Sequence, residues 1–230
     1  YMSYVLSHTP DAPSGYFYDG REPGNLLEEF SLDWSSGWDF VERTVAHLYT
    51  RKRPTPGGFV GGIAYGGQAG TRLCVKDHRG AYGVSTMDLV APEQFPGNPG
   101  SRNAFVWDVF VAAHEIGHNI GAPHTHNCFW SPPIDTCQLK RDGTDACYDD
   151  PALRRVRVGT IMSYCHLVNG SSTALDFGPR ASERMRTWID GANCIEIPDE
   201  PMIGITSPRG SDTWAGGSQV TIKWVSSMVT

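Results

Sequence analysis

The chain has 230 residues, of which 40% are hydrophobic and 19% are charged, and its net charge is −6. This length allows one good hydrophobic core, or one domain with the start of another. The negative charge argues against nucleic acid or an anionic membrane surface as a main partner, and no run of 18 apolar residues is present that would span a membrane.

The first part of the chain predicts a helix packed on a sheet. Residues 1–30 are rich in turn-forming residues and predict irregular chain, with a short strand at 26–32. Apolar residues at helical spacing predict an amphipathic helix over 39–49. Two β-rich runs, 59–65 and 81–87, predict the next strands.

The next predicted helix, residues 103–119, is apolar over much of its surface, as a buried central helix should be. Its last turns carry His114 and His118, which are four residues apart and therefore lie on the same face. At this spacing one zinc ion can accept a nitrogen from each ring at about 2.0–2.1 Å. The helix therefore indicates a metal site.

The residues around this pair complete a candidate zinc centre. Glu115 points to the side, within reach of a water on the metal rather than of the metal itself. Gly121 can adopt the positive φ that ends a helix, and Pro123 prevents the helix from resuming. The turn brings His124 towards the same point as a third ligand. Three histidines with a fourth position left to water are typical of a catalytic zinc site.

A second pattern lies some tens of residues downstream. The string from His114 to His124 resembles the long zinc signature of the metzincin metalloproteases. Residues 159–165, Gly-Thr-Ile-Met-Ser-Tyr-Cys, resemble the Met-turn of that family, with Met162 as an apolar floor beneath the zinc. The two motifs together imply a metzincin-type zinc endopeptidase. Its fold would be mixed α/β (α+β), with a twisted sheet, an active-site helix and one catalytic Zn²⁺.

The resemblance implies roles for further residues. Glu115 would be the general base for the attacking water. Tyr164 has the spacing of a tyrosine that, in astacins and serralysins, binds zinc and swings away to stabilise the oxyanion. The alternative is a wall of the specificity pocket. In the family, a strand matching 59–65 pairs with substrate as an added antiparallel strand, and an ordinary sheet strand fits the sequence equally well. The residues concerned are Gly62, Ile63, Ala64 and Tyr65.

Six cysteines lack the Cys-x-x-Cys spacing of a zinc knuckle, so disulfides in an oxidising, extracellular compartment are the better interpretation. The sequence alone does not decide their pairing. Resemblance to the reprolysin branch, the snake-venom and ADAM-like proteases, implies a Cys74–Cys194 bond. For the other four cysteines we expect Cys128–Cys165 and Cys137–Cys147.

The segment after His124 departs from the family pattern. Reprolysins carry Asp directly after the third histidine and astacins Glu, whereas Thr125 stands here; that residue normally helps to anchor the Met-turn. His126 can compete for zinc, but the spacing from Gly121 favours His124, which leaves His126 behind the ligands or on the surface. The aspartates that follow are either a calcium site or a solvated loop, without the regular Asp-x-Asp-x-Asp-Gly pattern. They are Asp135, Asp142, Asp145, Asp149 and Asp150.

Residues 179–191 predict the last helix of the catalytic domain, with Met185, Trp188 and Ile189 facing inward. The domain would cover residues 1–195. Metzincin domains usually open with strand, helix and strand, and this opening is not visible in the sequence. We therefore expect the natural domain to begin upstream of this chain.

The last part of the chain has a different character. Residues 196–202 predict a short, stiff linker, and residues 203–230 alternate apolar and polar positions like two strands of a hairpin. This alternation resembles the opening strands of an immunoglobulin-like, all-β sandwich. Because a sandwich needs about seven strands, we expect only its start to be present.

The sequence thus predicts a secreted zinc endopeptidase that acts on protein or peptide substrates, with a monomer favoured. The alternative is a zinc-containing extracellular binding or adhesion module with little or no proteolytic activity. Loss of Glu115 or of a histidine ligand would favour the alternative, and all four residues are present.

Overall fold

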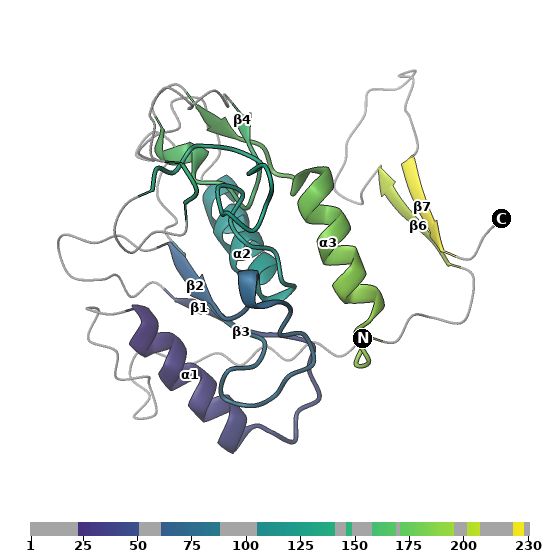
Figure 1. The fold of residues 1–230 in the computed structure, drawn as a ribbon. Coiled ribbons are helices and arrows are strands. Elements are labelled where there is room, and N and C mark those ends of the chain that lie inside the picture. Colours follow the sequence, from purple (N-terminus) through teal and green to yellow (C-terminus); the bar gives the residue numbers. More distant parts are fainter. Residues whose placement is uncertain are drawn as a thin grey trace. The chain divides into compact units, whose positions relative to one another are not determined.

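Figure 1 shows the computed structural model, which describes residues 23–50, 61–87, 105–140, 146–148, 158–168, 171–195, 202–207 and 223–227. The chain divides into two compact units, Tyr1–Cys194 and Ile195–Thr230. The predicted irregular start, the loop before the active-site helix and most of the predicted linker lie outside the described residues.

The first unit contains a three-stranded mixed sheet. The central strand β3 (Tyr82–Thr86) pairs in parallel with β1 (Ala46–Thr50) and antiparallel with β2 (Gly62–Ala64). The order β1-β3-β2 leaves β2 at an edge of this sheet among the described strands. Every residue of β3 is buried, as expected for a central strand covered on both faces. The strand predicted at 81–87 is confirmed.

The helix α1 (Pro23–Gly37) corrects the predicted strand at 26–32. Its apolar side chains Leu26, Leu27 and Phe30 follow a helical spacing, and all three are buried in the core cluster that includes Tyr82 of β3. Pro23 suits a first helical turn, where its missing N–H is not needed. The turn-forming residues of the preceding sequence led us to predict irregular chain here and to miss this helix.

The strand β1 corrects the predicted helix at 39–49. Apolar residues do recur at helical spacing there, but parallel pairing with β3 fixes the backbone as a strand. The ladder joins His47 to Gly83 and Tyr49 to Ser85, and the Ala46 N–H donates to the carbonyl of Ala81 at 2.8 Å. Tertiary pairing has overridden the local helical pattern.

The helix α2 (Phe105–Asn119) packs on β2 and β3, which agrees with the helix predicted there (Figure 1). Its last residue, Asn119, is fully buried, and its side-chain amide donates to the carbonyls of Tyr65 at 2.8 Å and Tyr82 at 2.9 Å. Gly121 follows with φ 99°, so the chain turns sharply. These contacts fix the end of the helix against the sheet.

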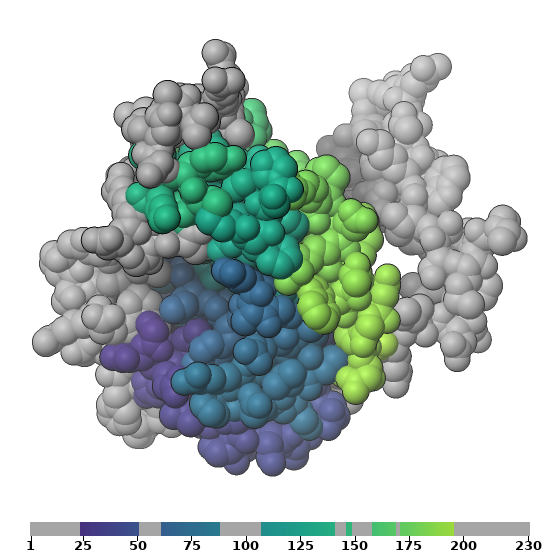
Figure 2. Space-filling view, in the orientation of Figure 1, coloured from purple at the N-terminus to yellow at the C-terminus, as the bar shows by residue number. Residues whose placement is uncertain are grey.

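The helix α3 (Gly178–Asp190) follows the Met-turn and ends before Gly191, as predicted. Met185 is buried, but Trp188 is 36% exposed, so the prediction that Trp188 faces inward is wrong. Its ring lies against Gly121, and the guanidinium of Arg184 stacks on it at 5.7 Å. Figure 2 shows the yellow-green surface of α3 beside the teal segment after His124. The Cζ atom of Arg184 also lies over the ring of Phe129, 4.2 Å from its centroid.

Three disulfides lie in the first unit. Cys74 is bonded to Cys194, the pair that the resemblance implied. The other predicted pairs are wrong, because the bonds are Cys128–Cys147 and Cys137–Cys165.

Local hydrogen bonds explain both pairings. The Cys147 N–H donates to the carbonyl of His126 at 3.1 Å, which brings Cys147 beside Cys128. Asp135 accepts the N–H of Cys137 at 3.0 Å and turns this cysteine inward. There it meets Cys165, and both sulfurs belong to buried residues.

The second unit contains two described strands, β6 (Met202–Ser207) and β7 (Lys223–Ser227). They pair antiparallel, with an irregularity between Ile205 and Ser207. The predicted hairpin alternation is consistent with this pair, whereas the immunoglobulin-like sandwich stays a prediction.

Candidate metal centre

The three histidines singled out in the sequence meet at one point. His114 and His118 come from successive turns of α2, and His124 returns after the Gly121 turn. The Nε2 atom of His124 lies 3.1 Å from Nε2 of His118 and 3.2 Å from Nε2 of His114. All three therefore present the same ring nitrogen to a common centre.

Backbone carbonyls orient two of these rings. Nδ1 of His114 lies 2.6 Å from the carbonyl of Ile161, and Nδ1 of His118 lies 2.8 Å from the carbonyl of Ala122. Because a carbonyl only accepts, each Nδ1 must carry the proton, which leaves the Nε2 lone pair facing the centre. This is the second hydrogen bond that metal-binding histidines make.

The donor set fits zinc. A tetrahedral ion with bonds of about 2.0–2.1 Å holds its ligand nitrogens about 3.3–3.4 Å apart. The observed separations of 3.1 and 3.2 Å are within a few tenths of this value. Burial, together with the two neighbouring histidines, lowers the pKa of His114 well below its usual range, so the ring is neutral and able to bind a metal.

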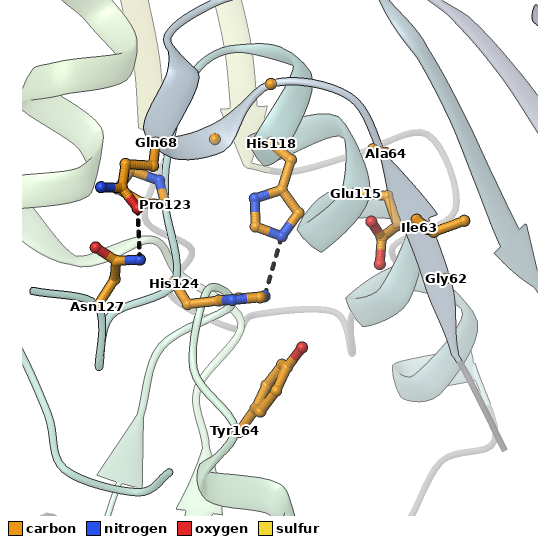
Figure 3. Close-up of a pocket in the computed structure, with 12 residues that line it drawn as sticks. Gly62, Ile63, Ala64, Gln68, Glu115, His118, Pro123, His124, Asn127 and Tyr164 are labelled. Carbon is orange, nitrogen blue, oxygen red and sulfur yellow. Dashed lines mark hydrogen bonds between the residues drawn. The ribbon is translucent and has the colours of Figure 1, made fainter. Parts of the chain in front are cut away.

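Glu115 lies between the edge strand and the histidines (Figure 3). Its side chain is 5% exposed, and burial raises the pKa of the carboxyl to about 8. Gly62 of β2 makes this position available: a Cβ there would lie 2.5 Å from Cγ of Glu115 and 2.7 Å from the carbonyl oxygen of Val84. A side chain at position 62 would therefore displace the carboxylate.

The turn below the histidines contains the predicted methionine. Met162 is fully buried, and a Cβ on Gly117 of α2 would lie 2.6 Å from its sulfur. The sulfur thus packs under the helix between the two ligand turns. Thr125, which replaces the family's acidic residue, donates both its N–H (3.0 Å) and its hydroxyl (3.2 Å) to the carbonyl of Met162. A hydroxyl therefore links the third ligand segment to the Met-turn.

The comparison with known families agrees with this geometry. A reprolysin-type family model, described as metallo-peptidase family M12, matches residues 7–173, which include the three histidines, Glu115 and Met162. The chain belongs to metallo-peptidase family M12. Membership supports zinc-dependent peptidase activity. A comparison with curated proteins found no match to the chain.

In this M12 peptidase, Tyr164 stands beside the histidines. Its ring centroid lies 4.6 Å from that of His124 and 6.0 Å from that of His114. His126 is fully buried and stacks on His124 at 5.0 Å with an interplanar angle of 20°. It therefore lies behind the third ligand and not on the surface. His166 is buried against Trp107 and Phe110 and lies edge-on to Tyr164 at 6.2 Å, but it does not line the cavity itself.

A cavity of about 380 Å³ opens above the histidines of the M12 centre. One wall consists of β2 and the 3₁₀ turn η1 (Gly67–Ala69), and the end of α2 with His124 forms the floor. Tyr164 and Asn127 complete the lining. Of the predicted strand residues, Gly62, Ile63 and Ala64 line this cavity, whereas Tyr65 follows β2 and donates its hydroxyl to Glu28 at 2.8 Å.

Sequence reasoning missed two polar side chains of this lining, Gln68 and Asn127. Neither belongs to a motif, and they stand 59 positions apart in the sequence. Only the fold brings them together.

Of the five aspartates considered as a calcium site or a solvated loop, the structure describes Asp135. Asp135 is buried and accepts the N–H of Cys137, and the two cysteines nearest to it form a disulfide. The other four aspartates of that loop lie outside the described residues.

Proposed function

We propose that the chain is a secreted zinc-dependent endopeptidase, with its catalytic domain in residues 1–195, that hydrolyses peptide bonds in proteins. His114, His118 and His124 would hold one zinc ion, and Glu115 would activate the water. The observation that carries the proposal is the convergence of three Nε2 atoms beside the buried Glu115 carboxyl and beside β2, an edge strand among the described strands.

The chemistry divides between the ion and the chain. Bound zinc supplies a Lewis acid that acidifies water and polarises the substrate carbonyl. Glu115 accepts the proton of the attacking water and then gives it to the leaving nitrogen. The carboxylate is positioned for both transfers because Gly62 leaves room for it directly beside the edge strand.

The edge strand would hold the substrate. The Thr86 N–H donates to Gly61, and the Tyr65 N–H donates to Tyr82, so alternate residues of this segment bond to β3. By the alternation of an antiparallel ladder, Gly62 and Ala64 direct their N–H and C=O groups to the open side. An extended peptide can pair there, next to Glu115.

Tyr164 has the position for oxyanion stabilisation. Its side chain lines the cavity next to His124, with the hydroxyl directed into the cavity (Figure 3). A phenol placed there can donate a hydrogen bond to the charge that develops on the carbonyl oxygen. Replacing Tyr164 by Phe should then lower kcat by about 10²-fold with little change in peptide binding.

One observation supports secretion. The three disulfides need an oxidising compartment to form and persist. None of the described helices has the length and apolar character that crossing a bilayer requires.

The test is cleavage of a denatured protein by the zinc-loaded chain, compared with Glu115→Gln and with added chelator. We expect cleavage by the wild type and loss by at least about 10³-fold in both other samples. Glu183→Gln, at an exposed position on α3, is the matched control and should cleave like the wild type. Folded, zinc-loaded wild type that cleaves nothing would instead favour a binding module.

A further inference from the structure

An amide pair lines the cavity beyond the histidines. Asn127 donates its side-chain NH₂ to the side-chain oxygen of Gln68 at 3.1 Å, as Figure 3 shows. Gln68 lies in η1, directly after the edge strand, and Asn127 lies three residues after the ligand His124. The pair therefore joins the two walls of the cavity on one side of the metal centre.

The polarity of this pair is fixed by a backbone group. The side-chain oxygen of Asn127 accepts the N–H of Phe129 at 2.6 Å, and a backbone N–H cannot be an acceptor. The side-chain NH₂ of Asn127 must therefore face Gln68, and the side-chain oxygen of Gln68 must accept its hydrogen bond. The NH₂ group of Gln68, a pure donor, then points away from Asn127, on a side chain that is exposed to solvent.

Asn127 is a firm support for this arrangement. It is 3% exposed, and its N–H donates to the carbonyl of His124 at 3.1 Å. It also forms a β-bridge with Ala146, next to the Cys128–Cys147 disulfide. These contacts hold the side chain of Asn127 in one orientation. Its hydrogen bond to Gln68 in turn fixes the orientation of the Gln68 amide.

The direction of the edge strand decides which part of a substrate meets Gln68. Gly62 lies against Glu115, whereas Gly66 and Gly67 lie against His118, so the chain advances along α2 towards Gln68. A peptide added antiparallel to β2 runs the opposite way. Its residues on the N-terminal side of the scissile bond therefore lie at the Gln68 end of the cavity.

We propose that Gln68, oriented by Asn127, is a specificity-determining residue that selects a carboxylate or amide side chain on the N-terminal side of the scissile bond. The proposal rests on the proposed function, because it needs an extended peptide on β2. The exposed NH₂ of Gln68 donates to the substrate oxygen, whereas the cationic group of a lysine or arginine is itself a donor and cannot accept from this NH₂.

The test measures peptide binding, so it does not depend on turnover. A positional library of extended peptides is captured on the zinc-loaded Glu115→Gln chain, and the bound peptides are sequenced. We expect one position to be enriched about tenfold in Asp, Glu, Asn and Gln over Lys and Arg. Adding Gln68→Glu keeps the acceptor for Asn127 but replaces the exposed donor by a carboxylate, which should reverse the preference towards Lys and Arg.

Three further variants separate hydrogen bonding from charge and folding. Gln68→Met removes the donor without adding charge and should abolish the preference without reversing it. Asn127→Asp offers only acceptors, so Gln68 must flip its amide and expose its oxygen, and the acidic preference should be lost. Gln138→Glu adds the same charge outside the cavity lining and should leave the preference unchanged.

The two proposals fail in different ways. Equal preferences in the Gln68 variants and their parent, or no selective binding by a folded parent, would overturn the role of Gln68. Selective binding that follows Gln68, combined with no cleavage by the wild type, would leave that role intact and refute the peptidase.

Discussion

The two walls of the cavity are built by different means. One wall, formed by β2 and η1 and packed against α2, depends on regular structure and on glycines that let backbones approach closely. The other wall comes from the loop after His124 and from the Met-turn. In its described residues, 124–140, 146–148 and 158–168, it has little regular structure and depends on two disulfides and side-chain hydrogen bonds. The comparison shows that the three clustered histidines are divided between a part of the fold held by packing and a part held by disulfides.

The largest effect should come from the packed wall. Gly66 has φ 124°, and a Cβ there would lie 2.1 Å from the backbone oxygen of His118. Because neither backbone can move without separating η1 from α2, Gly66→Ala should destabilise the fold by about 3 kcal/mol or more and abolish cleavage. Gly24→Ala is the control, since its Cβ would meet nothing within 4 Å. Equal urea midpoints for the two variants would contradict this account.

The crosslinked wall should respond next. Replacing Cys137 and Cys165 together by Ala removes the bond that holds the Met-turn to the loop, at a cost of about 3 kcal/mol. The double replacement of Cys128 and Cys147 should cost a similar amount, but its main effect should be on peptide selection near Asn127. Denaturant unfolding and peptide capture on each variant measure the two effects. Identical changes in peptide selection for the two double variants would argue against separate roles for the two disulfides.

The stability of the sheet behind the packed wall should depend on pH through His47. Burial lowers the pKa of His47 in β1 to about 4, while one ring nitrogen contacts the hydroxyl of Ser85 at 2.8 Å. The unfolded chain, with an ordinary histidine pKa of about 6.5, binds the proton more readily. Stability is therefore complete above about pH 6.5 and falls as the pH decreases towards 4, by about 2 kcal/mol at pH 5.

The measurement compares wild type with His47→Gln by urea unfolding at pH 7.5 and pH 5. Because other groups also contribute to the pH dependence of unfolding, only the difference between the two proteins reports on His47. That difference should shrink as the pH falls, and a difference independent of pH would refute the assignment.

The smallest effect should come from one hydroxyl in the crosslinked wall. Thr125→Val keeps the shape of a fully buried side chain and keeps its N–H bond to Met162, but loses the second bond. We expect a loss of about 1 kcal/mol and a modest decrease in kcat. Thr187→Val, at an exposed position on α3, is the matched control for unfolding and activity.

The sequence was most informative where one element carries the whole pattern. His114, Glu115 and His118 share a single helix, so their geometry follows from helical periodicity. The position of His124 followed from one glycine turn. The β1 strand was missed because its pattern suited a helix equally well, and only pairing with β3 decides between the two.

Features of the site that join distant segments could not be predicted from the sequence either, because local patterns do not specify them. The pairing of Cys137 with Cys165 depends on how Asp135 turns the loop inward, and no local pattern specifies this turn. The contact of Gln68 with Asn127 depends on η1 meeting the loop after His124. The link from Thr125 to Met162 needed the structure, since the family pattern favours an acid at that position.

The Cys74–Cys194 bond has a consequence for how this protein would age. It joins residues 120 positions apart, so the chain between them, including the metal centre, is a closed covalent ring. A single cut by the protein's own activity in any loop of that ring would leave both pieces attached. Self-digestion would then be invisible on a non-reducing gel and would show only after a reductant opened the ring.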